Sequence, residues 1–524
     1  MKNNKVLNNP FFLFIFCTLL LLLLTKIDFR FDEINPGSFV DDAEYYYHAQ
    51  TIAVDYDLDY SNQMPNTPYR NLNFDYPNKV LPVHSIGLGI FASPFLFISN
   101  QISGYVDLNS VISLNYYIYS LTPILYLFIS IILIEKILLL NQLNYKKYIL
   151  YLIVLGSGVS YFAFESFSMS HVYEFFATTV LIYLMTIYEK SSLSTQKKLK
   201  FFIPVFMFIA LTIRWSNYFY FLIPLFYSKF ISNKKMYFYR SPLFIAGAVT
   251  GLILFLLHTK YLYGIYTINP SDIFFQVEDR IEPDYYRFFD LSRVDENIFY
   301  IIKSFLIINF SQEFGLLYFS PILFIGYFSL LHNFYKRNMS HFFILLLICL
   351  FPFFSTLVLN NPGYSYGYRY LYSTIPIFII LFFKEYYETT ILKKYIVFGS
   401  LFALISQLLF ETTQLTVLSS DYLTNTFGLY TKYVNPLYLS GVIKSLFIAD
   451  AYLNMIFTSF LGVLIIKVIA LIENPAIFIE KFRPLNDDIT NLINNSLNFS
   501  WLMVFIIIIF YTICIKKLSS IRTN

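Results

Sequence analysis

Charged side chains are scarce in this chain of 524 residues. Only 13% of the residues are Asp, Glu, Lys or Arg, whereas a soluble domain of average composition carries about 25%. So few charges cannot cover a soluble body of this size, because 57% of the residues are hydrophobic. A soluble globular enzyme is therefore excluded, and lipid is the expected solvent for much of the surface.

Cysteine is rare as well, with three residues in the chain, and each lies inside an apolar run. None belongs to a CxxC pair or to a cluster of Cys and His, so neither a zinc finger nor a redox pair is indicated. The net charge is only +4, and no basic block alternates with aromatic residues as a nucleic-acid groove requires. Nucleic acid is therefore not an expected partner.

The sequence contains several long apolar runs. A helix needs about 20 apolar residues to cross the hydrocarbon of a bilayer, and several runs approach that length. They include residues 11–24, 111–134, 241–257, 341–359 and 501–515. We expect an all-α, polytopic bundle of about 11 to 13 transmembrane helices. Residues 1–395 are expected to form one module, and residues 396–524 a variable C-terminal group of helices. Because no small-residue cleavage site follows the first run, it is predicted to be an uncleaved first span.

Basic residues predict which loops face inward. Lys and Arg concentrate in cytoplasmic loops, and successive basic groups here are separated by enough apolar sequence for an out-and-back pair of helices. These groups are Lys2/Lys5, Lys146/Lys147, Lys197/Lys198/Lys200, Lys234/Lys235/Arg240, Lys336/Arg337 and Lys393/Lys394. The loops between them should face outward from the cell membrane. The richness in Ile, Lys, Asn, Phe and Tyr favours a bacterial source.

The first outward loop, residues 26–110, is large and acidic. It carries eleven Asp and Glu residues against four Lys and Arg residues. Residues 84–99 within it are apolar but contain Gly87, Gly89 and Pro94. This composition predicts a re-entrant or surface-lying helix rather than a full span.

The most polar stretch of this loop begins with Asp41, Asp42 and Glu44, followed by Tyr45 and Tyr46. A carboxylate at the membrane face, partly screened from water by aromatic rings, can have a raised pKa and act as a general base. A solvated acidic loop or a site for a divalent metal ion explains the same residues. Metal binding therefore stays open, and no other cofactor is expected.

Two further groups fall on the outward side. Glu165, His171 and Glu174 lie at the outer end of a helix pair, where polar groups are costly and are functional candidates by default; interfacial anchoring is the alternative. Arg214 and Arg369 lie in two other outward turns. A guanidinium suits a phosphate bidentately, whereas snorkelling at a helix end would need no ligand.

Another outward turn, residues 312–321, has Glu313 as its only charge. Carboxylates, a histidine and arginines from loops distant in sequence thus fall on one side of the membrane, whereas the inner loops carry mainly lysine. A single outward site is the simplest explanation.

These residues resemble the C-fold (GT-C) superfamily of glycosyltransferases that use polyprenyl-phosphate sugars, which includes protein O-mannosyltransferases and lipid A aminoarabinose transferases. The resemblance covers residues 1–390. It rests on Asp41-Asp42 with Tyr45-Tyr46, Asp57-Leu-Asp59, Pro82-Val-His84-Ser-Ile-Gly87, Ser170-His171, Gly315-Leu-Leu-Tyr-Phe-Ser320-Pro321 and Gly367-Tyr-Arg369-Tyr-Leu before Pro376.

The resemblance implies a GT-C-like fold and an enzyme that transfers a sugar, with inversion, from a polyprenyl-phosphate donor to a hydroxyl of a lipid, glycan or protein. The family's acidic residue in the first outer loop, its proposed general base, corresponds to Asp41, with Asp42 as the second choice. Arg369, Arg214 and His171 would bind the donor phosphate. The residues expected to line the substrate are Glu44, Tyr45, Tyr46, His84, Glu165, Glu313 and Tyr368.

Two other functional classes stay open. A polymerase or ligase of O-antigen or another polysaccharide would carry its catalytic residues in a large late outer loop, whereas the acidic residues here follow the first span. A lipid or sugar transporter (flippase) would carry ionisable residues near the middle of its spans, and few are found there.

Overall fold

The computed structural model describes residues 40–63, 84–103, 114–164, 167–232, 238–268, 294–310, 315–359 and 368–409. Within these ranges every regular element is a helix and no strand occurs. The predicted helical fold class is thus confirmed for the described part of the chain. The first and last apolar runs and residues 410–524 lie outside the described residues, so the number of spans stays a prediction.

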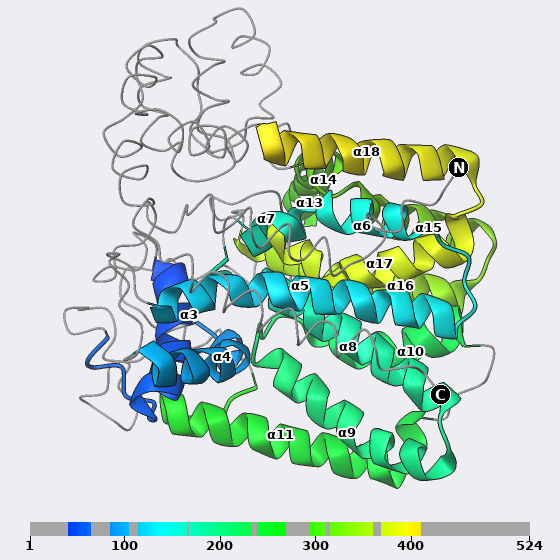
Figure 1. Ribbon diagram of the computed structural model, residues 1–524. Helices are drawn as coiled ribbons and strands as arrows, with labels where there is room; N and C mark the ends of the chain where they lie inside the picture. The colour runs from blue at the N-terminus through cyan, green and yellow to red at the C-terminus, as the bar shows by residue number, and fades with distance from the viewer. Residues whose placement is uncertain are drawn as a thin grey trace, which may run out of the picture.

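The α-helices, drawn in Figure 1, are α3 (Val40–Gln50), α4 (Gly87–Ser103), α5 (Leu114–Leu140), α6 (Lys147–Leu155), α7 (Gly158–Phe164), α8 (His171–Lys190), α9 (Leu193–Leu211), α10 (Ile223–Phe226), α11 (Pro242–Tyr263), α13 (Val294–Phe310), α14 (Leu316–Phe319), α15 (Phe324–Tyr335), α16 (Met339–Leu359), α17 (Ile375–Leu381) and α18 (Thr390–Leu409). Short 3-10 and π segments continue or join them: η1 (Thr51–Asp55), η2 (Tyr218–Leu222), η3 (Tyr227–Ile231), η4 (Phe238–Arg240), η7 (Pro321–Leu323), η8 (Arg369–Thr374) and η9 (Phe382–Tyr386).

Three of the described helices, α5, α8 and α11, are long and apolar enough to cross a membrane. The pair α6 and α7, bent by 71° at its break, would make a fourth span if it crosses as one. α5 contains most of the apolar run 111–134, and α11 contains most of the run 241–257. α11 also exposes apolar side chains along its length, for example Val249 and Ile253, which suits contact with lipid. The described helices therefore fit a membrane protein.

The long helices run side by side, and α3 lies across one end of them (Figure 1). α5 packs on α8, α8 on α9, and α9 on α11, while α4 packs on α3 and α5. The end that α3 covers, called here the α3 end, holds the first residues of α5 and α8 and the last residues of α9 and α11. Segments from five helices therefore meet at the α3 end.

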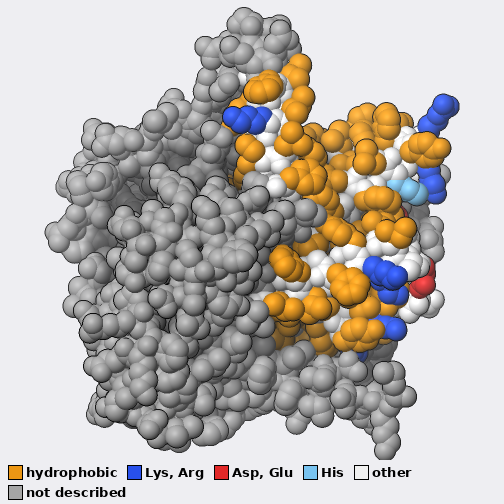
Figure 2. Space-filling view, turned by 90° about the horizontal axis from the view of Figure 1, so that it is seen from above, with side chains coloured by type: hydrophobic (Ala, Val, Ile, Leu, Met, Phe, Trp, Pro, Cys, Tyr) orange, Lys and Arg blue, Asp and Glu red, His pale blue; other side chains and the backbone are white. Residues whose placement is uncertain are grey.

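The basic turns that the structure describes lie at the opposite end. There Asn144 donates a hydrogen bond to Glu388, which joins the turn after α5 to the turn after η9, and Tyr227 of η3 donates one to Glu189 in the last turn of α8. Figure 2 shows Lys and Arg mostly at one edge of the described surface, with apolar side chains over much of the rest. Among the described residues, Lys and Arg are therefore concentrated at one end of the long helices, which is the asymmetry that the sequence predicts.

The segment predicted to lie along the surface forms α4, which is shorter than the candidate spans. The backbone N–H of Gly87 donates to the carbonyl of Thr212 at 2.7 Å. A Cβ on Gly89 would lie 2.4 Å from the Cβ of His48. Both glycines thus allow α4 to approach neighbouring backbone, which fixes it between α3 and the end of α9.

The contact between α9 and α11 gives a test of this packing. A Cβ on Gly247 of α11 would lie 2.1 Å from the carbonyl oxygen of Phe201 on α9. In a helix without such a contact, Gly→Ala stabilises by about 1 kcal/mol. We expect Gly247→Ala instead to lower the thermal unfolding temperature in detergent, because the two backbones must move apart. The exposed neighbour Ala246 supplies the control: Ala246→Leu should leave that temperature unchanged. A stabilised Gly247→Ala protein would refute the close α9–α11 contact.

Candidate functional site

A buried carboxylate joins the polar side chains at the α3 end. Glu174 lies in the first turn of α8 and is fully buried. Its Oε1 accepts a hydrogen bond from Ser170 at 2.8 Å and lies 3.1 Å from Nδ1 of His171 and 3.4 Å from Nη1 of Arg214. Its Oε2 accepts a hydrogen bond from Nδ2 of Asn217 at 2.8 Å. These contacts offset the cost of removing the charge from water.

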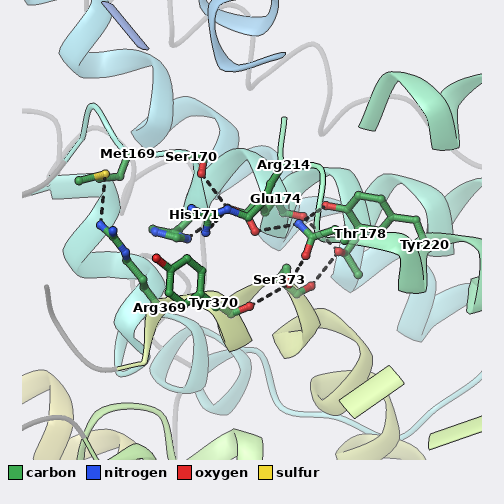
Figure 3. A network of polar contacts seen from close by, with 11 residues as sticks. Met169, Ser170, His171, Glu174, Thr178, Arg214, Tyr220, Arg369, Tyr370 and Ser373 are labelled. Atoms are coloured by element: carbon green, nitrogen blue, oxygen red, sulfur yellow. Dashed lines mark hydrogen bonds and ion pairs between the residues drawn. The ribbon is translucent and has the colours of Figure 1, made fainter. Parts of the chain in front are cut away.

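Two arginines lie against one aromatic ring. The guanidinium carbon of Arg214 is 4.6 Å from the ring centre of Tyr370, and that of Arg369 is 5.4 Å away (Figure 3). Arg369, the first residue of η8, also donates from Nη1 to the sulfur of Met169 at 3.5 Å. Cations are attracted to the face of an aromatic ring. Tyr370 therefore holds two cationic groups from segments distant in sequence.

His171 is fully buried beside these groups. Its Nδ1 faces Glu174, and its Nε2 has no hydrogen-bond partner. The ring contacts Phe162, with ring centres 4.5 Å apart, and lies near Tyr370 and Tyr372. A ligand from outside could touch this imidazole only if those aromatic rings moved.

Asn217 extends the network to η8. Its Oδ1 accepts a hydrogen bond from the Ser373 hydroxyl at 3.2 Å, and its Nδ2 also donates to the Tyr220 hydroxyl at 3.2 Å. Thr178 of α8 donates to the carbonyl of Ser373 at 2.7 Å (Figure 3). The start of α8, the turn after α9 and η8 are thus held together by side-chain hydrogen bonds.

A second carboxylate and histidine lie at the same end. Glu44 of α3 is buried, and its Oε2 accepts hydrogen bonds from Nδ1 of His84 at 2.6 Å and from the backbone N–H of His84 at 3.0 Å. The ring of Tyr45 lies 5.3 Å from that of His84. The His84 side chain is 11% exposed, so it reaches solvent while Glu44 does not.

His48 fixes the backbone next to this pair. Its Nε2 lies 3.0 Å from the carbonyl of His84, and its Nδ1 lies 2.7 Å from the Tyr60 hydroxyl. A carbonyl oxygen only accepts, so Nε2 carries the proton and Nδ1 accepts from Tyr60. Burial lowers the pKa of His48 to about 4, so the ring is neutral near pH 7. His48 therefore holds α3 against the start of α4.

The predicted phosphate-binding residues Arg214, Arg369 and His171 belong to one cluster in the structure. Tyr368 is buried directly before η8. Tyr46 is buried too, and its ring packs against the ring of Tyr116 with centres 4.9 Å apart.

The proposed base residues cannot be located as closely. Asp41 and Asp42 lie in the first turn of α3, but their side chains lie outside the described residues. Glu165 and Glu313 also lie outside them. Among the residues that the structure describes, no group of three or more His, Cys, Asp or Glu is arranged to hold a metal ion.

The sequence-based candidates did not include Asn217, Tyr370 and Ser170, which contact the charged groups of the site. Each lies near a predicted residue in the chain, since Tyr370 follows Arg369, Ser170 precedes His171, and Asn217 lies three residues after Arg214. Glu174 was considered with His171 but was given no role. Ser170 and Tyr370 also belong to the motifs that carry the family resemblance.

The ion pair of Glu174 and Arg214 gives a second test. Removing one partner of a buried ion pair costs roughly 3–5 kcal/mol, and somewhat less is expected here because the Arg214 side chain is 16% exposed. Glu174→Ala should therefore strongly destabilise the purified protein against denaturant. The double variant Glu174→Ala/Arg214→Ala should recover part of the loss, because no unpaired charge remains. Equal stability of the wild type and Glu174→Ala would rule out the proposed bridging role.

Comparisons with known proteins assign no family. No family model matches the chain, and no curated protein matches it in sequence. Among solved structures, the chain is similar to the apo-form crystal structure of the oligosaccharyltransferase of Archaeoglobus fulgidus, with 12% identity and a TM-score of 0.32. The match covers 90% of this chain and 59% of that protein, so the chain spans less than two thirds of its length. A similarity this weak carries no argument about fold or activity.

Proposed function

We propose that the chain is a multi-pass membrane glycosyltransferase with its active site on the outward face of the cell membrane. It would transfer a sugar from a polyprenyl-phosphate donor to an acceptor hydroxyl and invert the anomeric carbon. The observation that most supports this is the pair Arg214 and Arg369 on the ring of Tyr370. A lipid phosphate is an anion at the membrane surface, and guanidinium groups bind phosphate through parallel hydrogen bonds.

The position of the two arginines supports their binding of an anionic ligand. Arg214 follows α9 at the α3 end, and Arg369 contacts the same ring of Tyr370. Both therefore lie opposite the described basic turns, against the usual bias of positive charge toward the cytoplasmic side. The Arg214 side chain is 16% exposed, and its buried Nη1 lies 3.4 Å from Glu174 and has no hydrogen-bond partner. Arg214 is thus held in place from its buried side, and part of its side chain reaches the surface.

The proposed reaction moves one proton and one electron pair. A base takes the proton of the acceptor hydroxyl, whose oxygen attacks the anomeric carbon as the bond to the lipid phosphate breaks. The phosphate leaves with the electron pair, and Arg369 and Arg214 stabilise its charge. One base suffices because phosphate already leaves readily, whereas a glycoside hydrolase needs a second carboxyl group as acid. Asp41 is the first choice for the base and Asp42 the second, from the family resemblance.

The remaining residues have supporting roles in this proposal. His171 is fully buried behind aromatic rings, whereas Arg369 is 5% exposed, so His171 would act on the donor through Glu174 and Arg214 rather than by contact. Glu44 orients His84, and Tyr45 lies beside that pair. The sequence-based assignments of Tyr46, Tyr368, Glu165 and Glu313 to the substrate lining, and of a divalent metal ion to the acidic stretch, stay proposals. The acceptor would be a lipid, a glycan or a protein.

Arg369→Gln tests the phosphate site. Purified protein in nanodiscs would be incubated with radiolabelled polyprenyl-phosphate sugars and membrane extract as the source of acceptor. We expect kcat/KM for the transferred donor to fall roughly 10- to 100-fold, the range for lost hydrogen bonds to a charged group, because the leaving phosphate loses a cation. The control is Arg240→Gln, at the exposed end of η4, which should keep wild-type activity. Wild-type kinetics for Arg369→Gln would exclude this phosphate site.

The base is tested by Asp41→Asn and Asp42→Asn. Asparagine keeps the size of the side chain and removes its ability to take a proton. In the same assay we expect Asp41→Asn to abolish transfer without loss of expression, and Asp42→Asn to do so if it is the base instead. Binding of the donor should persist in the inactive variant. Full transfer activity in both variants would eliminate the two residues as the base.

A further inference from the structure

Two helices begin side by side at the basic end of the described helices. α6 and α18 pack along each other (Figure 1), and a Cβ on Gly156, directly after α6, would collide with the carbonyl oxygen of Ser400 in α18. Just before the two helices, Asn144 donates a hydrogen bond to Glu388 at 3.0 Å. The two segments are thus in contact both at the helix starts and further along, so α6 and α18 run parallel with their N-termini together.

Lysine occupies these two helix starts. Lys146 and Lys147 are the N-cap and the first residue of α6, and Lys393 and Lys394 lie in the first two turns of α18. Neither helix has an acidic residue in its first turn, and no side chain caps the N-terminus of α6. A helix N-terminus carries a partial positive charge, which favours anions and disfavours cations. Four lysines beside two such ends therefore create a positive potential that favours a bound anion.

Carboxylates of the chain balance part of this charge. Nζ of Lys147 lies 3.1 Å from Glu135, and Glu388 accepts the hydrogen bond from Asn144. The other three lysines form no ion pair with a carboxylate in the part of the chain that the structure describes. Positive charge thus remains in excess at the two helix starts.

A buried hydroxyl belongs to the same cluster. Tyr387, in the turn between η9 and α18, is 3% exposed, and Nζ of Lys393 lies 4.0 Å from its ring centre. Burial raises the pKa of Tyr387, and the nearby Tyr148 and Glu388 raise it further, so the hydroxyl keeps its proton. This hydroxyl is buried and has no hydrogen-bond partner among the described residues. A buried donor without an acceptor is costly, and an anionic oxygen would remove that cost.

Exposed apolar and aromatic side chains adjoin the lysines. Tyr148 is 54% exposed, and its ring centre lies 5.8 Å from Nζ of Lys146. On α18, Ile391 is 80% exposed and Phe398 is 65% exposed. Tyrosine is enriched where a membrane meets water, and exposed apolar side chains suit contact with acyl chains. The anion that fits this surface therefore carries acyl chains next to its charge.

We propose that the N-termini of α6 and α18 form a binding site for the headgroup of an anionic phospholipid of the cytoplasmic leaflet. The lipid phosphate lies among Lys146, Lys393 and Lys394 and accepts a hydrogen bond from Tyr387. Helix N-termini bind phosphate groups, and basic sites between helices on the cytoplasmic side bind anionic headgroups. The bound lipid neutralises the lysines and so holds α6 against α18, at the end opposite the arginines of the candidate active site.

Lipid binding to the purified protein in detergent tests this site. Native mass spectrometry would give the Kd for phosphatidylglycerol, with phosphatidylcholine as the uncharged comparison. We expect phosphatidylglycerol to bind more tightly. The double variant Lys393→Gln/Lys394→Gln should raise its Kd roughly tenfold, because two cations near the headgroup are lost. Tyr387→Phe keeps the ring and removes the hydroxyl, and should raise the Kd roughly fivefold, as for one lost hydrogen bond.

The matched control is Lys197→Gln/Lys198→Gln, which removes two exposed lysines near the start of α9, at the same basic end. Its Kd should equal that of the wild type. An equal loss of affinity in this control would indicate attraction to the whole basic end and overturn the site. Equal binding of phosphatidylcholine would also overturn it, as would competition by glycerol phosphate at the same concentration, since the acyl chains would then contribute nothing. A wild-type Kd in both Lys393→Gln/Lys394→Gln and Tyr387→Phe would likewise refute the proposal.

Discussion

The arrangement of the α3 end depends on the buried charge of Glu174. A carboxylate that is removed from water must be paired and hydrogen-bonded, and the partners of Glu174 come from two separate segments. Ser170 and His171 belong to the start of α8, whereas Arg214 and Asn217 belong to the turn after α9. Because Asn217 also binds Ser373, η8 is drawn to the same place. One carboxylate thus brings both arginines to the ring of Tyr370.

The two carboxylates of the site are arranged in the same way. Glu174 and Glu44 are buried, and each contacts a side chain that still reaches solvent, Arg214 in one case and His84 in the other. A charged side chain that a buried partner already holds in place loses less conformational entropy when it binds a ligand. The buried carboxylates therefore fix the positions of the two partly exposed side chains.

Parts of this arrangement could be predicted from the sequence. The apolar runs predicted α5 and α11, and sorting the loops by charge predicted that His171, Arg214 and Arg369 lie together. The bridging role of Glu174 could not be predicted, because its contact with Arg214 depends on how α8 packs on α9.

The contacts of Arg369 show how an aromatic ring holds a guanidinium in this site. Tyr370 attracts the face of the cation, and its ring centre lies 5.4 Å from the guanidinium carbon of Arg369. The N–H groups lie in the plane of the guanidinium, so a contact with its face uses none of their hydrogen bonds. One of them donates to the sulfur of Met169 at 3.5 Å. Tyr370 therefore positions Arg369 without taking up its hydrogen-bonding capacity.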